Sequence, residues 1–217
     1  MVERSDRIKY ISFDLDGTLI DSLDFEISFW NETIPRIFSK QHNVPFSEAK
    51  KIVLNAYRKF SKEEVEWHIP EYWFKKFKLK DDWTSAIKDL KDRIKIFPEV
   101  KRILRKLSKK YKLVLLTHSL QESVELKMAK LGIQKYFYKI FSAIEDFSLV
   151  KYDERVYKIL IEKLRINAKE LVHVGDDHKC DYSTPRRIGI RAILIDRSGK
   201  RKGKDIIHDL TKIESIL

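Results

Sequence analysis

The segment Phe13-Asp14-Leu15-Asp16-Gly17-Thr18-Leu19 follows an apolar run and places two carboxylates two residues apart. Side chains at this spacing leave a β-strand on the same face, so Asp14 and Asp16 can act on one ligand. The glycine that follows them permits a sharp turn and keeps the backbone accessible. Such a pair can hold a divalent cation and leave one carboxylate oxygen free for nucleophilic attack.

A second acidic group lies in the segment Gly175-Asp176-Asp177-His178-Lys179-Cys180-Asp181, directly after another apolar run. Clustered carboxylates repel one another, and their pKa values rise unless a cation neutralises them. Carboxylate oxygens without thiolate partners suit magnesium, and the single cysteine excludes both a multi-cysteine zinc site and an internal disulfide. We therefore expect Mg²⁺ as the cofactor; the alternative for any single aspartate is a helix cap or a solvated loop.

Two further polar residues stand at the edges of predicted elements. Thr117 ends the apolar segment 112–117, where its hydroxyl can bind a phosphate oxygen or cap a helix. Lys151 precedes a predicted helix, where it can place positive charge on a transferring phosphoryl group. Taken alone, one lysine among 45 basic residues does not indicate that role.

Strands that alternate with helices predict an α/β fold, in which a parallel sheet carries helices on both faces. The predicted strands cover residues 8–15, 112–117, 138–142, 171–175 and 191–195, and a terminal helix carries Ile206, Ile207, Leu210 and Ile213. Ligands bind beyond the carboxyl ends of the strands in such sheets. Both acidic groups and Thr117 follow strand ends, so the pattern predicts that they meet.

Residues 22–94 differ from the rest of the chain, because they hold all four tryptophans and show helical rather than alternating periodicity. One predicted helix follows Ser47 and carries Ile52, Ala56 and Phe60. Another begins at Asp81 or Asp82 and carries Trp83, Ile87, Leu90 and Ile94. We expect about four helices that form an inserted domain at 21–95, and a core made of 1–20 and 96–217. Most of the tryptophans are expected to pack these helices together, and a minority to face a cleft.

Together, four motifs resemble those of the haloacid dehalogenase (HAD) superfamily. They are Asp14-Leu15-Asp16-Gly17-Thr18-Leu19, Thr117, Lys151 and Gly175-Asp176-x-x-x-x-Asp181. The resemblance covers residues ~8–20 and ~96–197, and the helical segment stands where the family has its C1-type cap. It implies a Rossmann-like core and a magnesium-dependent phosphatase that acts on a small phosphorylated metabolite.

The resemblance also implies roles for individual residues. Asp14 would be the nucleophile and form an aspartyl-phosphate, and Asp16 the general acid and then the general base. Magnesium would be held by Asp14, the backbone carbonyl of Asp16, and Asp176. The phosphoryl contacts would come from Thr117 and Lys151, with support from Asp181; Asp177 could share the metal role.

Three positions depart from the common pattern of the family. His118 stands where many members have asparagine, so it either supplies a titratable substrate contact or makes a loop hydrogen bond. Tyr152 replaces a proline after the lysine. Ser183-Thr184-Pro185 replaces a small glycine-alanine pair, and Pro185 is expected in the first turn of a helix.

Other functions share parts of this pattern. A dehalogenase has the same fold but generally lacks the second aspartate and the metal, and a phosphomutase needs a bisphosphate intermediate. A response-regulator-like phosphoacceptor has similar residues, but it is about half this length and lacks the insert. The net charge of +12 leaves a nucleic-acid-binding protein as a further alternative.

The overall composition narrows the class of protein. The 217 residues include no apolar run of membrane-spanning length, and the first seven residues are too polar for a signal peptide. A cytoplasmic protein is expected, as a monomer or a homodimer, with no membrane partner. The positive charge is spread along the chain, which favours a solvated surface and small anionic ligands over nucleic acid. Abundant Lys and Glu with few amides fit a thermophilic source.

Overall fold

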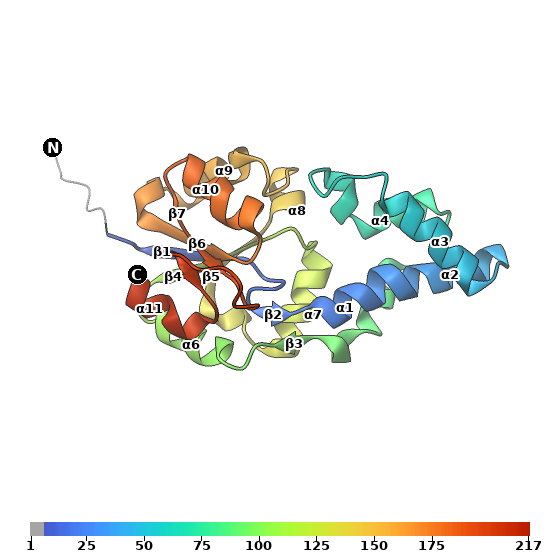
Figure 1. Cartoon of the computed structure of the whole chain (residues 1–217), viewed down its shortest axis with the longest axis horizontal. Helices are drawn as coiled ribbons and strands as arrows, with labels where there is room; N and C mark the ends of the chain where they lie inside the picture. The colour runs from blue at the N-terminus through green and yellow to red at the C-terminus, as the bar shows by residue number, and fades with distance from the viewer. Residues whose placement is uncertain (1–6) are drawn as a thin grey trace.

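The computed structural model describes residues 7–217 and contains a six-stranded parallel sheet (Figure 1). The strand order is β5-β4-β1-β6-β7-β8, so the first strand of the chain lies inside the sheet. In chain order these strands are β1 (Tyr10–Phe13), β4 (Lys112–Thr117), β5 (Phe137–Ser142), β6 (Leu171–Gly175), β7 (Arg191–Ile195) and β8 (Ile206–Ile207). The α/β class predicted from the alternating pattern is confirmed.

Helices cover both faces of the sheet. They are α6 (Val100–Leu107), α7 (Gln121–Leu131), α8 (Ala143–Phe147), α9 (Glu154–Leu164), α10 (Thr184–Arg187) and α11 (Ile213–Ile216). Successive strand residues point to opposite faces: Leu113 and Leu115 join the hydrophobic cluster that contains α6 and α7, whereas Val114 and Leu116 join the cluster that contains α8 and α9. The buried strands are therefore apolar on both sides, as parallel strands generally are.

The parallel register brings the carboxyl ends of three strands to one edge. Phe13 of β1 pairs with Leu115 of β4 on one side and with Val174 of β6 on the other. Asp14, which follows β1, donates its backbone N–H to the Val174 carbonyl over 2.9 Å. The polar residues after these strands therefore start from neighbouring positions.

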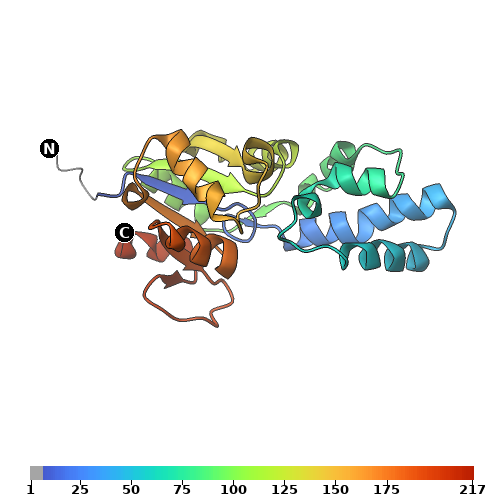
Figure 2. The same cartoon turned by 90° about the horizontal axis from the view of Figure 1, so that it is seen from above.

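A helical insert, residues 22–94, lies between two short strands. The strands β2 (Ile20–Asp21) and β3 (Lys95–Ile96) pair antiparallel, so the chain leaves and re-enters the core at one point. Between them lie α1 (Leu23–Ser28), a π-helical turn (Phe29–Thr33), α2 (Ile34–His42), α3 (Phe46–Tyr57), α4 (Pro70–Lys76) and α5 (Trp83–Lys88), with short 3₁₀ turns at Val65–His68 and Lys91–Arg93. Figure 2 shows these helices beside the sheet rather than on it.

Several local predictions are confirmed. Asp82 caps α5, because its carboxylate accepts from the backbone N–H groups of Thr84 and Ser85. Pro185 lies in the first turn of α10, where its missing N–H costs nothing. Within residues 7–217, no helix has both the length and the apolar character that crossing a membrane requires.

Other boundaries and faces were predicted wrongly. The buried face of α3 is Ala49, Val53 and Tyr57, and Ile52 is 41% exposed. Two series at four-residue steps compete there, and only packing against the other helices selects between them. Helix α5 ends at Lys88, and β1 is shorter than 8–15. Residues 1–6 of the predicted core lie outside the described residues.

The terminal segment also differs from the prediction. Ile206 and Ile207 form strand β8 instead of beginning a helix. They pair in parallel with Leu194 and Ile195, so they satisfy the backbone groups along the open edge of β7. The sequence alone does not show that this edge lacks another partner.

Candidate active site

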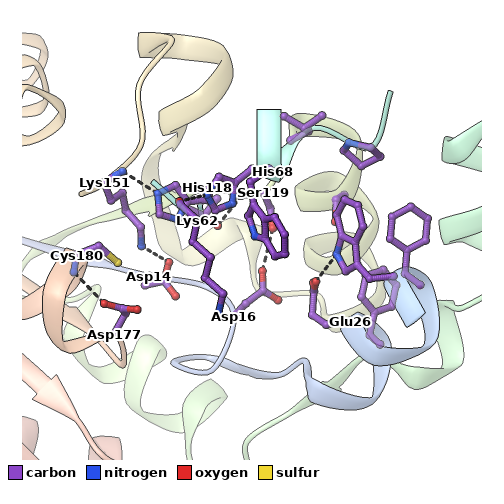
Figure 3. Close-up of a pocket in the computed structure, with 18 of the residues that line it drawn as sticks. Asp14, Asp16, Glu26, Lys62, His68, His118, Ser119, Lys151, Asp177 and Cys180 are labelled. Atoms are coloured by element: carbon purple, nitrogen blue, oxygen red, sulfur yellow. Dashed lines mark hydrogen bonds and ion pairs between the residues drawn. The ribbon is translucent and has the colours of Figure 1, made fainter. Parts of the chain in front are cut away.

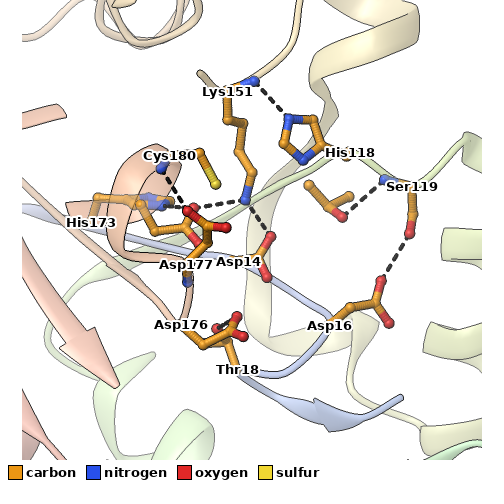
Figure 4. A network of polar contacts seen from close by, with 12 residues as sticks. Asp14, Asp16, Thr18, His118, Ser119, Lys151, His173, Asp176, Asp177 and Cys180 are labelled. Atoms are coloured by element: carbon orange, nitrogen blue, oxygen red, sulfur yellow. Dashed lines mark hydrogen bonds and ion pairs between the residues drawn. The ribbon is translucent and has the colours of Figure 1, made fainter. Parts of the chain in front are cut away.

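Three carboxylates converge where β1 and β6 end. One oxygen from each of Asp14, Asp176 and Asp181 lies within 4.8 Å of the others. Asp14 and Asp176 follow the two neighbouring strands, and Asp181 comes from the π-helical turn His178–Ser183. Figure 4 shows Asp14 at the end of the Lys151 side chain, with Asp176 farther along, next to Thr18. The structure thus brings Asp14 of the first acidic group to Asp176 and Asp181 of the second, which are distant from it in the chain.

Lys151 lies inside this group of carboxylates. Its Nζ donates to Asp14 Oδ1 and, over 2.8 Å, to Asp181 Oδ1, and its side chain is 1% exposed. Burial lowers the pKa of Lys151, but the charges of Asp14 and Asp181 outweigh that effect, and its pKa is well above its usual value. Lys151 therefore stays protonated and places one positive charge among three acidic groups.

A buried chain of hydrogen bonds through His173 and Ser12 holds Asp181 in place. His173 Nε2 lies 3.0 Å from Asp181 Oδ1, and His173 Nδ1 lies 2.5 Å from Ser12 Oγ. Burial lowers the pKa of His173, so a neutral ring donates through Nε2 and accepts at Nδ1. Burial alone would raise the pKa of Asp181, but Lys151 and His173 hold it well below the usual range.

The carboxylates of Asp14 and Asp176 are not fully neutralised by the nearby positive charge. Burial raises the pKa of Asp14 well above its usual value, even though Lys151 lowers it, and repulsion from Asp181 and Asp176 adds to the effect. Burial, followed by repulsion from Asp181, raises the pKa of Asp176 to about 6. A divalent cation would favour the ionised form of both groups, so this set of oxygen ligands fits Mg²⁺.

Glycine at position 17 makes room for Asp176. Gly17 has φ +79°, which L-residues rarely adopt, and a Cβ atom there would lie 2.3 Å from Asp176 Oδ2. Thr18 Oγ1 donates to the same carboxylate, at Oδ1, over 3.1 Å. The glycine of the first motif is therefore required by close approach as well as by the turn.

The side chain of Asp16 lies outside the three-carboxylate group. Lys127 Nζ lies 2.8 Å from each of its oxygens, and Ser119 Oγ donates to Oδ2 over 2.9 Å. The sequence reasoning did not select Lys127 or Ser119. The periodicity of α7 carried a signal for Lys127, because this residue follows Val124 by three positions and shares its buried face.

Asp177 and Thr117 make local contacts in this structure. Asp177 caps the π-helical turn by accepting from the backbone N–H groups of Lys179 and Cys180, and Tyr152 Oη donates to it over 3.2 Å. Thr117, which is 2% exposed, accepts from the backbone N–H of Ser119 over 3.1 Å. Asp177 is not part of the carboxylate group, but both Asp177 and Thr117 line the cavity beside that group.

His118 forms a loop hydrogen bond and also lines the cavity. Its Nε2 accepts from the backbone N–H of Lys151 over 2.7 Å. Its ring stacks on His68 of the insert, with centroids 4.3 Å apart, and lies 5.8 Å from the ring of Tyr152. Burial lowers the pKa of His118 well below its usual value and that of His68 to about 4, so both rings are neutral at pH 7.

A cavity of about 310 Å³ opens over the carboxylates, between the core and the insert. Lys62 of the insert lines it, and Figure 3 shows the Lys62 side chain drawn between those of Lys151 and Asp16. The insert also lines it with Trp30, Trp67 and Trp83, so three of the four tryptophans reach the cavity. Trp73 is fully buried and packs within the insert. The prediction that only a minority of the tryptophans face the cleft was therefore wrong.

Known proteins resemble this chain in sequence and in fold. The chain is 26% identical to the glyceraldehyde 3-phosphate phosphatase of Methanocaldococcus jannaschii over 209 residues, which are 93% of this chain and 90% of that protein. The structure matches a HAD phosphatase from Thermococcus onnurineus with a TM-score of 0.85 at 23% identity, over 96% of this chain and 97% of the other. It matches a 2-haloacid dehalogenase from Pseudomonas syringae with a TM-score of 0.70 at 23% identity, over the same shares of the two chains.

The family model of the haloacid dehalogenase-like hydrolases matches residues 11–195, which include both acidic groups and the whole insert. This match spans most of the chain, and it agrees with the fold and with the four motifs in their order along the sequence. The chain belongs to the haloacid dehalogenase-like hydrolase family.

Proposed function

We propose that the protein is a magnesium-dependent phosphatase, which hydrolyses a small phosphate monoester through an aspartyl-phosphate on Asp14. The observation that carries the proposal is the position of Asp14 beside Lys151, inside a group of three carboxylates, of which Asp14 and Asp181 are buried, at the base of a cavity. The similarity to a glyceraldehyde 3-phosphate phosphatase over most of the chain supports a phosphorylated substrate.

In the first step, a carboxylate oxygen of Asp14 attacks phosphorus and the bond from phosphorus to the leaving oxygen breaks. Asp16 gives a proton to that oxygen, so the product leaves as a neutral alcohol. In the second step, Asp16 takes a proton from a water molecule that attacks phosphorus. The bond between Asp14 and phosphorus breaks, inorganic phosphate leaves, and both carboxyl groups return to their starting states.

The remaining residues stabilise charge and exclude solvent. Lys151 lies against Asp14 Oδ1 and balances negative charge on the transferred phosphoryl oxygens, and Thr117 and His118 line the same end of the cavity. Asp14 and Asp176 would hold Mg²⁺, together with the backbone carbonyl of Asp16, and the ion would neutralise phosphoryl charge. The insert would act as a cap that keeps water out until a substrate is bound.

The leaving group would lie against the insert side of the cavity, where Trp30, Trp67 and Trp83 supply apolar surface and Lys62 supplies a positive charge. This combination suits a small organic phosphate rather than a nucleic-acid strand. The phosphomutase and phosphoacceptor alternatives, the cytoplasmic location and the choice between monomer and homodimer stay predictions of the sequence.

The test is phosphate release from a panel of phosphate esters with Mg²⁺, by the wild type and by D14N and D16N. We expect D14N to lose turnover entirely and D16N to lose about 10²-fold or more, because the first removes the nucleophile and the second a proton-transfer group. Unchanged rates in both variants would contradict the proposal. Turnover of 2-haloacids without metal would instead identify a dehalogenase.

A further inference from the structure

Helix α7 carries a lysine that is fully buried behind Asp16, and Asp16 itself lines the cavity. Lys127 has no solvent exposure, although a lysine is rarely buried unless its charge is paired. Its ammonium lies 2.8 Å from each oxygen of Asp16, 3.3 Å from Glu26 Oε1 and 3.3 Å from Ser119 Oγ. The proposed mechanism assigns no role to this group.

These contacts fix the side chain of Asp16 from two directions. One oxygen accepts from Lys127, and the other accepts from both Lys127 and Ser119. An aspartate whose two oxygens are held by a fully buried ammonium and a half-buried hydroxyl cannot rotate freely about its side-chain bonds. The orientation of the proposed acid and base is thus determined by residues of the loop after β4 and of helix α7.

The same ammonium reaches the insert. Glu26 belongs to α1, and its second oxygen, Oε2, accepts from Trp30 Nε1 over 2.8 Å. Trp30 lines the cavity and contacts the ring of Tyr57 edge to face. A continuous series of polar contacts therefore runs from Trp30 through Glu26 and Lys127 to Asp16, and Figure 3 shows Glu26 and Asp16 on the same side of the cavity.

We propose that Lys127 is a positioning residue, which holds the carboxylate of Asp16 in place for proton transfer and ties it to the insert through Glu26. The inference rests on the proposed phosphatase function. It predicts that loss of the ammonium impairs protonation of the leaving group more than it impairs attack by Asp14. A displacement of about 1 Å in a catalytic group can cost about 10²-fold in rate.

The test compares kcat/KM across phosphate monoesters whose leaving groups range from p-nitrophenol to a simple alkyl alcohol. We expect K127M to lose about 10²-fold on the alkyl ester and clearly less on p-nitrophenyl phosphate, because p-nitrophenolate leaves without being protonated. A purely structural role would lower kcat/KM by the same factor for every ester. K130M is the matched control, since Lys130 lies on the same helix in an exposed ion pair with Asp92.

K127M leaves Asp16 and Glu26 without a cation, so the charge-balanced variant E26Q/K127M provides a second test that places less strain on folding. Relative to E26Q, this double variant should show the same steeper dependence of kcat/KM on the leaving group that K127M shows relative to the wild type. If the wild type is active and D14N is inactive, an unchanged dependence of kcat/KM on the leaving group in both lysine variants would overturn this inference and leave the proposed function standing. Absence of phosphate release by the wild type would overturn the proposed function, and the inference with it.

Discussion

The imidazole ring of His68, from the helical insert, stacks on that of His118, from the core, with centroids 4.3 Å apart and planes inclined by 17°. His118 in turn accepts a hydrogen bond from the backbone N–H of Lys151. An ion pair between Glu63 and Lys179 joins the same segment of the insert to the core. The insert is thus connected through His118 to the loop that carries Lys151.

The first prediction concerns pH and this stacked pair. His68 has a pKa of about 4 in the folded protein and 6.5 as its usual value, chiefly because of burial. The unfolded chain therefore binds a proton between these values that the folded chain does not, so stability falls as pH is lowered through this window. We expect H68F, which keeps a planar ring but cannot titrate, to lose less stability than the wild type between pH 7 and pH 5.

The measurement is urea unfolding of both proteins at the two pH values. His118 is present in both, so its own titration cancels to first order, and the difference should be on the order of 1 kcal/mol. An equal loss of unfolding free energy in H68F and in the wild type would show that His68 does not contribute.

The second prediction concerns the contribution of Lys151 to stability. A lysine whose head group faced an open cleft could be replaced without unfolding the core. The structure buries that group between Asp14 and Asp181. Breaking a buried pair leaves an uncompensated charge and costs about 3–5 kcal/mol.

K151M should therefore lower the melting temperature strongly as well as abolish turnover. K158M provides the control, because Lys158 forms an exposed pair with Glu154 on α9 and should change stability by less than about 1 kcal/mol. The double variant K151M/D181N should recover part of the loss, since it also removes one of the two stranded charges. Equal melting temperatures for K151M and K158M would contradict the buried pairing.

The third prediction concerns metal binding. Mg²⁺ should raise the melting temperature in a saturable way, because a ligand at 100 times its Kd stabilises the folded state by about 2.7 kcal/mol. The affinity for Mg²⁺ should fall as pH is lowered through about 6, where Asp176 begins to bind a proton that competes with the metal.

Calorimetric titration of D176N and D177N separates the two neighbouring aspartates. D176N should lose most of the Mg²⁺ affinity, whereas D177N should keep it, because asparagine can still cap the turn that Asp177 caps. Loss of affinity in D177N but not in D176N would move the site to the other aspartate.

Much of the core could be predicted from the sequence, because apolar runs on strands buried on both faces and amphipathic helices each carry a local signal. The run 112–117 is an example of a segment found as expected. The insert was less predictable in detail. Its aromatic residues occur at several helical spacings, so Ile52 was expected inside and Val53 was found there.

The sequence by itself determined which residue types follow the strands: two aspartates before a glycine, a threonine and a second acidic group. It also placed a lysine before a helix. Only the tertiary structure decided which of these residues contact one another, because side-chain direction depends on neighbours that are distant in the chain. In the folded chain Asp181 lies beside Asp14 and Asp176, whereas Asp16 accepts from Lys127. Burial also decided the charges, since the pKa of Asp176 and that of His68 follow from desolvation, which no short motif encodes.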